Sequence, residues 1–286
     1  MTIDYQKLLA LDIPEVVQTY TPKDCILYAL GLGFGQSPLD ENELAFVYEK
    51  DLEVLPTMAV VLGYPGFWMK DLDTGIDWVN MLAGEHALTM HQPLQPSATI
   101  IGRTRVVEII DKGRVRGALV YSERSIEDQV SGARIATIRQ TAFCRNDGGF
   151  GGPPRQQPAP HAIPQRPPDL VDDRPTRPEM ALLYRLSGDP NPLHVDPAVA
   201  RAAGFPRPIL HGLGTFGVAG YAILKNFCGW DPARLGAISG RFSAPVFPGE
   251  TIRTEMWRDG AVVSFRARVA ERDVVAINNG RADLLV

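Results

Sequence analysis

The chain is poor in cysteine and in net charge, and it has no long apolar run. Its three cysteines, Cys25, Cys144 and Cys228, are odd in number and widely spaced, which favours reduced thiols in a cytoplasmic protein over a disulfide or metal framework. A formal net charge of −4 without any basic run argues against nucleic acid as a partner. No apolar run approaches the roughly 20 residues that a membrane span needs, and the first residues lack the features of a signal peptide. We therefore expect a cytoplasmic protein that does not engage a membrane.

The most informative segment is residues 184–194, YRLSGDPNPLH, which gathers polar side chains between helix-breaking residues. Its glycine and two prolines exclude a regular helix, so Asp189, Asn191 and His194 are displayed from a shaped loop. A carboxylate and an imidazole five residues apart can share one water molecule, which is the equipment of general acid/base catalysis. The structural alternative is that Asp189 caps the following turn and His194 belongs to the core.

A buried helix is predicted over residues 213–226, because this Gly- and Ala-rich stretch has almost no polar face. It begins directly after His211 and Gly212. A helix start carries unpaired N–H groups and about half a positive elementary charge, so it can stabilise a developing oxyanion. Gly212 lacks a side chain and lets a ligand approach the backbone closely.

Two other kinds of site can be considered at these positions. Residues 212–217, GLGTFG, formally match GxGxxG, but two prolines precede them and no alternating βαβ pattern surrounds them, which argues against a nucleotide-binding loop. Asp189, His194, Asp196 and His211 could instead bind a metal, although their spacing is not that of a known metal site. Metal binding stays an alternative at this point.

The chain carries a weak internal repeat. QPLQPSATI at 92–100 resembles APVFPGETI at 244–252, and YAL at 28–30 resembles YRL at 184–186. Each proline-containing phrase is followed by alternating residues typical of strands. With the 156-residue offset of the second pair, Gly33 and Pro38 occupy the places of Asp189 and His194. Only the second half is therefore predicted to do chemistry, and the first half to shape a pocket.

Three parts of the chain follow from this repeat and from the distribution of breakers. Residues 146–178 contain nine of the 24 prolines, which is too many for a helix or a central strand. We assign them to a linker between an N-terminal unit, 1–145, without catalytic residues, and a C-terminal catalytic unit, 179–286. A helix followed by a run of strands in the second unit predicts an α+β fold.

The segment YRLSGDPNPLHVDPAVARAAGF resembles the signature of the MaoC-like, R-specific (type 2) enoyl-CoA hydratases, with Ala200 at its last defined position. The resemblance extends over the whole chain to the hydratase region of peroxisomal multifunctional enzyme type 2. It is carried by GE at 84–85, IIDKG at 109–113, GGFGG at 148–152 and RFSAPVFPGETIRTEMW at 241–257. The resemblance implies a double hotdog, in which two long helices are each wrapped by one half of a continuous antiparallel sheet.

The resemblance also implies a function and a set of site residues. The function is reversible syn hydration of trans-2-enoyl-CoA to (R)-3-hydroxyacyl-CoA, of the kind used in fatty-acyl or sterol side-chain β-oxidation. Asp189 and His194 would orient the water and Gly212 would stabilise the oxyanion. The residues expected to contact the acyl-CoA are Asn191, Gly84, Ala83, Lys112 and Phe242.

Three functional classes remain compatible with the sequence, namely a hydratase, a hotdog acyl-CoA thioesterase and a non-catalytic acyl-CoA-binding protein. The complete SGDPNPLH phrase favours hydration. Coenzyme A is then part of the substrate, and no separate cofactor or metal is expected. Relatives suggest a homodimer.

Overall fold

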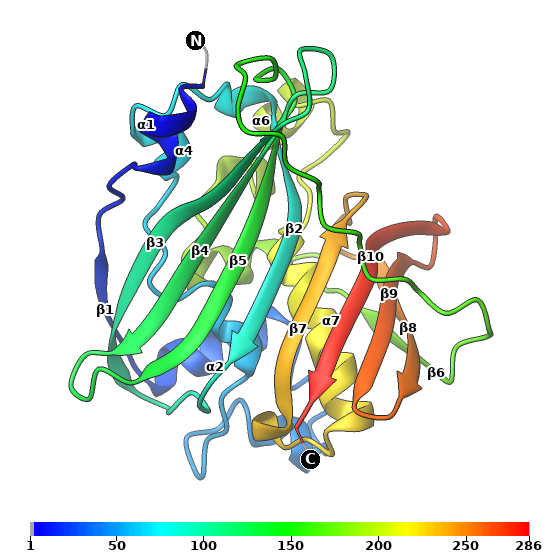
Figure 1. Ribbon diagram of the computed structural model, residues 1–286. Coiled ribbons are helices and arrows are strands. Elements are labelled where there is room, and N and C mark those ends of the chain that lie inside the picture. The colour runs from blue at the N-terminus through cyan, green and yellow to red at the C-terminus, as the bar shows by residue number, and fades with distance from the viewer. Residues whose placement is uncertain (1–2, 286) are drawn as a thin grey trace.

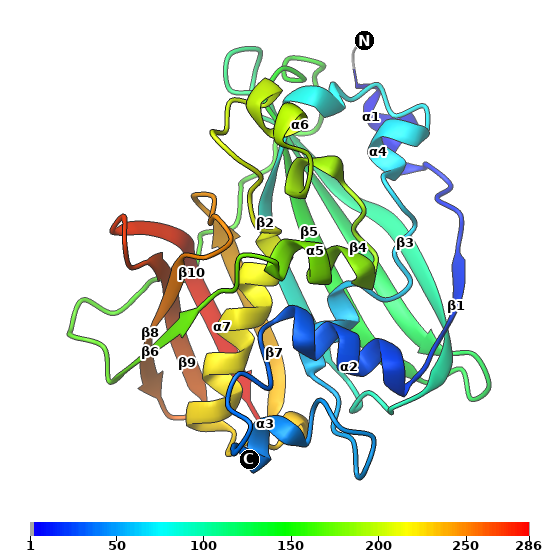
Figure 2. The same ribbon diagram turned by 180° about the vertical axis from the view of Figure 1, so that it is seen from behind.

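The computed structural model describes residues 3–285, which form one ten-stranded antiparallel sheet with helices on one of its faces (Figures 1 and 2). The strand order is β1-β3-β4-β5-β2-β7-β10-β9-β8-β6. The strands are β1 Val16–Tyr20, β2 Met81–Met90, β3 Ala98–Asp111, β4 Ala118–Asp128, β5 Arg134–Cys144, β6 Leu170–Pro175, β7 Leu235–Phe242, β8 Thr251–Asp259, β9 Val262–Val269 and β10 Val274–Leu284. The helices are α1 Tyr5–Leu9, α2 Pro22–Gly31, α3 Glu41–Leu44, α4 Trp68–Asp71, α5 Met180–Tyr184, α6 Pro197–Ala202 and α7 Gly212–Phe227. The 3-10 helices are η1 Pro56–Val60, η2 Trp78–Asn80, η3 Arg185–Ser187, η4 Pro192–His194 and η5 Pro232–Arg234.

The two halves of the sheet join where β2 pairs with β7, so that Glu85 lies opposite Arg241 and the two side chains form an ion pair. The repeat is visible at the level of elements. Both proline-containing phrases lead into a strand, β3 in the first half and β8 in the second. Tyr28 of α2 and Tyr184 of α5 pack together with ring centroids 5.8 Å apart. The α+β fold with a continuous antiparallel sheet is confirmed, and so is its duplicated character.

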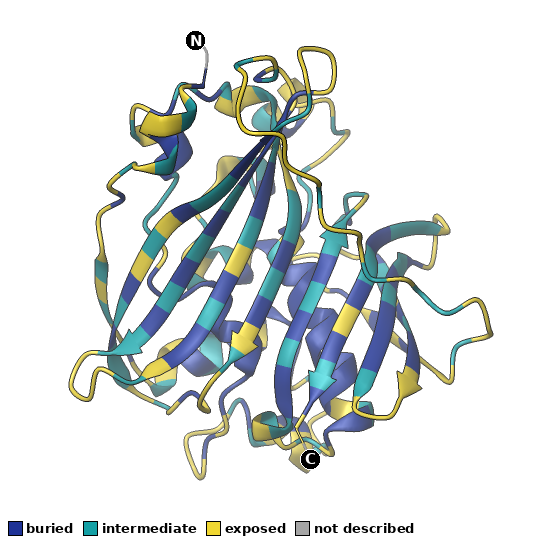
Figure 3. Cartoon of the chain, viewed as in Figure 1, coloured by how far each residue is buried: buried dark blue, intermediate teal, exposed yellow. Residues whose placement is uncertain are grey.

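The long helix α7 is the centre of the core (Figures 2 and 3). It spans Gly212–Phe227, one residue longer at each end than predicted. Its glycines allow close packing, since a Cβ on Gly217 would lie 2.6 Å from Leu32 and one on Gly220 would lie 2.7 Å from Thr57. The small residues of α7 therefore allow the first half of the chain to pack directly on the helix.

The first half differs from the expectation of a long helix in each repeat. The 156-residue offset makes residue 56 the counterpart of Gly212, where α7 begins. At residue 56 the structure has only the short 3-10 helix η1, which is followed by irregular chain and the single turn α4. The physical reason is local, because Gly63 and Gly66 adopt positive φ angles of 57° and 75° on either side of Pro65. A continuous helix cannot pass through these residues.

The segment predicted as a linker contains both irregular chain and a strand. Its C-terminal part forms β6, an edge strand that pairs only with β8, where proline is tolerated. The preceding chain crosses the helix-free face of the second half of the sheet (Figure 1). There the His161 ring lies 2.8 Å from the Ser264 hydroxyl, and the Asn279 amide donates to the His161 carbonyl at 2.7 Å.

A buried polar cluster between β6, α3 and α7 connects the two halves of the chain. The Arg174 guanidinium of β6 donates to the Glu43 carboxylate at 2.6 Å, to the Tyr221 hydroxyl at 2.8 Å and to the carbonyl of Gly33. The hydrogen bonds from Arg174 and Tyr221 hold the pKa of Glu43 below its usual range in spite of its burial. Gly33, the counterpart of Asp189, thus has a structural role in the first half.

Candidate active site

The loop between α5 and α6 owes its shape to hydrogen bonds within the SGDPNPLH phrase. Gly188 has a φ of 122°, which a residue with a side chain rarely adopts. The Asp189 carboxylate accepts from the Asn191 N–H at 3.2 Å, and the Asn191 side chain accepts from the Leu193 N–H at 3.0 Å to cap η4. Asn191 therefore fixes the loop, and its exposed position leaves it accessible to a ligand. The loop is a rigid support for Asp189.

His194 is buried with 8% exposure and is held in one tautomer. Its Nδ1 lies 2.9 Å from the carbonyl oxygen of Ile209. Because a carbonyl only accepts, Nδ1 carries the proton and Nε2 keeps a free lone pair. Burial lowers the pKa of His194 below its ordinary value, against the smaller opposing effects of the Ile209 carbonyl and Asp189. At neutral pH His194 is thus an uncharged imidazole that can accept a proton.

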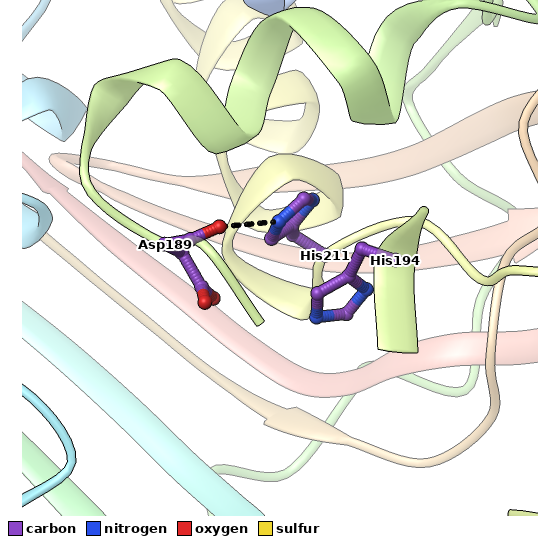
Figure 4. A group of neighbouring side chains, drawn as sticks. All are labelled: Asp189, His194 and His211. Carbon is purple, nitrogen blue, oxygen red and sulfur yellow. Dashed lines mark hydrogen bonds between the residues drawn. The ribbon is translucent and has the colours of Figure 1, made fainter. Parts of the chain in front are cut away.

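His211 completes the group (Figure 4). Its Nε2 lies 3.2 Å from the backbone carbonyl oxygen of Asp189, and its ring stacks on that of His194 with centroids 3.7 Å apart. One carboxylate oxygen of Asp189 and one ring nitrogen of each histidine lie within 4.8 Å of one another. Burial and the neighbouring His194 lower the pKa of His211 to about 4, so it too is neutral at pH 7.

The orientation of the two histidine rings bears on which ligand these three side chains can share. The planes of the two imidazoles are only 27° apart, and ring-nitrogen lone pairs lie in the ring plane. The two lone pairs therefore lie in stacked, nearly parallel planes, whereas a tetrahedral zinc site needs its ligand lone pairs to converge on one point. Asp196, which was considered as a fourth ligand, instead caps α6 by accepting from the Ala198 N–H at 2.7 Å.

The start of α7 lies next to this group. Gly212 is the first residue of the helix and directly follows His211, its N-cap. Gly212 is exposed, while the following turns of α7 are buried. A Cβ at this position would lie 3.2 Å from the Phe242 ring. The Gly212 N–H is thus part of an accessible helix N-terminus beside Phe242, and such a terminus carries unpaired N–H groups.

The other expected substrate contacts lie on the first-half sheet. Ala83 and Gly84 form an irregularity in the pairing of β2 with β5, and a Cβ on Gly84 would lie 3.0 Å from the Thr141 carbonyl oxygen. Lys112 follows β3 at the same end of the sheet, with its Nζ 3.4 Å from the Gln157 side chain and 5.7 Å from the Phe143 ring centroid. The structure thus does not bring these residues into the Asp189–His194–His211 group.

Sequence reasoning did not identify the role of His211 in this arrangement. The sequence suggests His211 only as a metal ligand. In the structure it is the N-cap of α7, and its ring contacts the Asp189 carbonyl, so it connects the loop that carries Asp189 to the start of α7. The signal was present, since His211 directly precedes the predicted oxyanion donor. What the sequence could not show is that its ring lies between Tyr184 and His194, with centroid distances of 5.0 and 3.7 Å.

Fold and site together define a double-hotdog protein whose second repeat carries the Asp189–His194–His211 group as a candidate acid/base site. Residues 18–146 match the MFE-2 hydratase 2 N-terminal domain and residues 160–280 match the MaoC like domain. The peroxisomal enoyl-CoA hydratase 2 of Arabidopsis thaliana is 40% identical over 93% of this chain and 91% of its own length.

Solved structures agree with this relationship. A MaoC-like dehydratase from Phytophthora capsici superimposes with a TM-score of 0.87 at 37% identity, covering 98% of both chains. A Mycobacterium tuberculosis protein described as a double hotdog superimposes over 100% of this chain and 96% of its own with a TM-score of 0.59; at 17% identity it shows the fold alone. The chain belongs to the MaoC-like hydratase 2 family.

Proposed function

We propose that this protein catalyses the reversible syn addition of water to trans-2-enoyl-CoA, giving (R)-3-hydroxyacyl-CoA, and is therefore a hydro-lyase. The observation that carries the proposal is the convergence of Asp189 and His194 beside the N-terminus of α7. The plant relative is named an enoyl-CoA hydratase 2, which supports the same reaction. The proposal extends to fatty-acyl or sterol-derived chains as substrates.

The side chains supply the steps of this reaction. Asp189 and His194 orient one water, and one of them takes a proton from it as the oxygen forms its bond to C3. Asp189 or His194 delivers a proton to C2 on the same face, so that the proton removed from water is replaced there, both side chains end in their starting states and the addition is syn. Negative charge develops on the thioester oxygen meanwhile, and the Gly212 N–H stabilises it, a contribution whose loss typically costs ~3–4 kcal/mol.

The acyl chain can extend toward the first half of the protein. A cavity of about 140 Å³ lies between the two halves, next to the loop residue that precedes Asp189. Its lining residues are Gln18, Thr19, Asp24, Leu27, Met58, Val61, Leu62, Leu186, Ser187 and Gly188. Most of them belong to the first half, which supports the prediction that the first half shapes the acyl pocket. The half-buried Lys112 is proposed to contact coenzyme A.

One assay separates hydration from the alternative activities. Purified protein is incubated with trans-2-enoyl-CoA, and the conjugated-enoyl absorbance and free thiol are followed together. We expect loss of absorbance without thiol release. Thiol release would instead indicate a thioesterase, and neither signal would indicate a binding protein.

We further propose that no metal or redox cofactor takes part. Dialysis against a strong chelator should then leave turnover unchanged, and a loss that Zn²⁺ restores would contradict this.

Among residues 3–285 no helix is long and apolar enough to cross a membrane. A cytoplasmic location and a homodimer remain predictions, to be measured by imaging of tagged protein and by light scattering; the plant relative is named peroxisomal.

A further inference from the structure

Polar side chains interrupt the helix-facing surface of the first-half sheet. On β4, Arg124 lies between Ile126, which belongs to the main hydrophobic core, and Val120, which belongs to a separate apolar cluster. The strand pairings place Thr104 of β3 opposite Arg124. They also place Ser122 opposite Gln140, and Gln140 opposite His86 of β2. Directly opposed residues of neighbouring strands share a face. A polar strip therefore crosses the sheet between the two apolar clusters.

Arg124 is the unusual member of this strip. It is 3% exposed, and within residues 3–285 the only hydrogen bond of its side chain runs from Nη2 to the Val60 carbonyl oxygen at 2.6 Å. No carboxylate of the described residues forms an ion pair with it, and its Nε has no partner. Arg174, the other buried arginine, has the Glu43 carboxylate and two further acceptors. A buried charge without a partner is strongly unfavourable unless something else compensates it.

The neighbours of Arg124 have unused hydrogen-bonding capacity as well. His86 Nε2 and Thr104 Oγ1 are buried without partners among the described residues. Burial lowers the pKa of Arg124 only to about 10, so the guanidinium remains charged at neutral pH. Burial and the nearby guanidinium lower the pKa of His86 to about 3. The strip is thus a cation with neutral polar groups around it and no anion.

The irregular segment that replaces the first-half helix connects this strip to the catalytic loop. Val60 accepts from Arg124, and the Tyr64 ring lies 5.3 Å from the guanidinium. Burial raises the pKa of Tyr64, Asp189 raises it further and Arg124 opposes them, so Tyr64 experiences both charges. On the other side, a Cβ on Gly188 would lie 3.7 Å from the Val61 carbonyl oxygen. Residues 60–64 therefore lie between Arg124 on one side and the loop that carries Asp189 on the other.

We propose that Arg124 is a specificity-determining residue that binds an anionic oxygen group, a carboxylate, carried by the acyl chain away from the thioester. This inference rests on the proposed hydratase function. A carboxylate can accept two parallel hydrogen bonds from a guanidinium and would compensate its charge. The unpartnered Thr104 Oγ1 and His86 Nε2 offer further hydrogen-bonding groups to such a ligand. The phosphates of coenzyme A are not the ligand, because such strongly hydrated groups need a solvent-accessible position, whereas Arg124 is 3% exposed.

The test compares two series of substrates of increasing chain length, trans-2-enoyl-CoAs that end in a methyl group and trans-2-enedioyl-CoAs that end in a carboxylate. We expect kcat/KM of the wild-type protein to favour the carboxylate at one chain length, by roughly 10- to 100-fold, the range for hydrogen bonds to charged groups. Arg124→Met should abolish this preference and retain or increase turnover of methyl-ended chains. Arg124→Lys should keep part of it.

Arg139→Met is the matched control, since Arg139 lies on the neighbouring strand β5 with a 71% exposed side chain; it should leave the preference unchanged. The inference is overturned if the wild-type protein favours the carboxylate at no length, if chains ending in a hydroxyl are favoured equally, or if Arg124→Met lowers turnover of both series alike. The wild-type comparison does not depend on how any variant folds. If the wild-type protein hydrates neither series, the proposed function itself fails.

Discussion

Replacing Asp189 by Asn tests whether the carboxylate serves chemistry or the fold. An amide oxygen can still accept from the Asn191 N–H, which the carboxylate does at 3.2 Å, so the loop should keep its shape. We expect the free energy of unfolding to change by no more than about 0.5 kcal/mol. Turnover should fall by roughly 10²- to 10⁴-fold, the contribution of a positioned acid or base, which corresponds to about 3–5 kcal/mol of activation free energy.

Asp196 provides a matched control seven residues further along the chain. Its exposed carboxylate caps α6 through the Ala198 and Val199 N–H groups at 2.7 and 3.4 Å. Asp196→Ala should therefore cost about 1 kcal/mol of stability and lower the melting temperature by a few degrees, with turnover nearly unchanged. Melting curves and the enoyl-absorbance assay measure both quantities. Near-normal turnover in Asp189→Asn, or equal losses of turnover in both variants, would refute the assignment.

Three further outcomes follow from the same geometry. Turnover should fall on the acid side only below pH 6.5, because burial depresses the pKa of His194 and protonation removes its lone pair; loss of turnover already above pH 7 would contradict this. The pKa of His86 is near 6.5 in the unfolded chain and about 3 in the folded protein. The unfolded chain therefore binds an extra proton as the pH falls below 6.5, and the free energy of unfolding decreases by about 2 kcal/mol between pH 6.5 and pH 4.5. His86→Leu should remove that share of the decline in denaturant melts, and an unchanged slope would disprove it. Lys112→Ala should raise KM several-fold with little change in kcat and less effect at high salt; a loss confined to kcat would be inconsistent with its role.

Local chemistry made much of this site predictable. The Gly and Pro residues of SGDPNPLH dictate a loop, and the long apolar run after Gly212 dictates a buried helix, because both depend on backbone preferences of nearby residues. The strands of the second half were likewise readable from their alternation. Gly63, Pro65 and Gly66 also show locally why no long helix follows position 56, whereas the double-hotdog resemblance implies a long helix in each half without saying where the first one lies.

Residue types and their order determined which groups are available: one carboxylate, one imidazole and one glycine at a helix start, all in the second repeat. Tertiary structure alone decided which groups meet. Stacking of His211 on His194, the position of Phe242 over Gly212 and the isolation of Arg124 beneath η1 all involve segments far apart in the chain. Such contacts depend on how the sheet and the helices pack on each other. The alternation of polar and apolar residues along one strand predicts which face of the sheet a side chain occupies, but not which residue it contacts there.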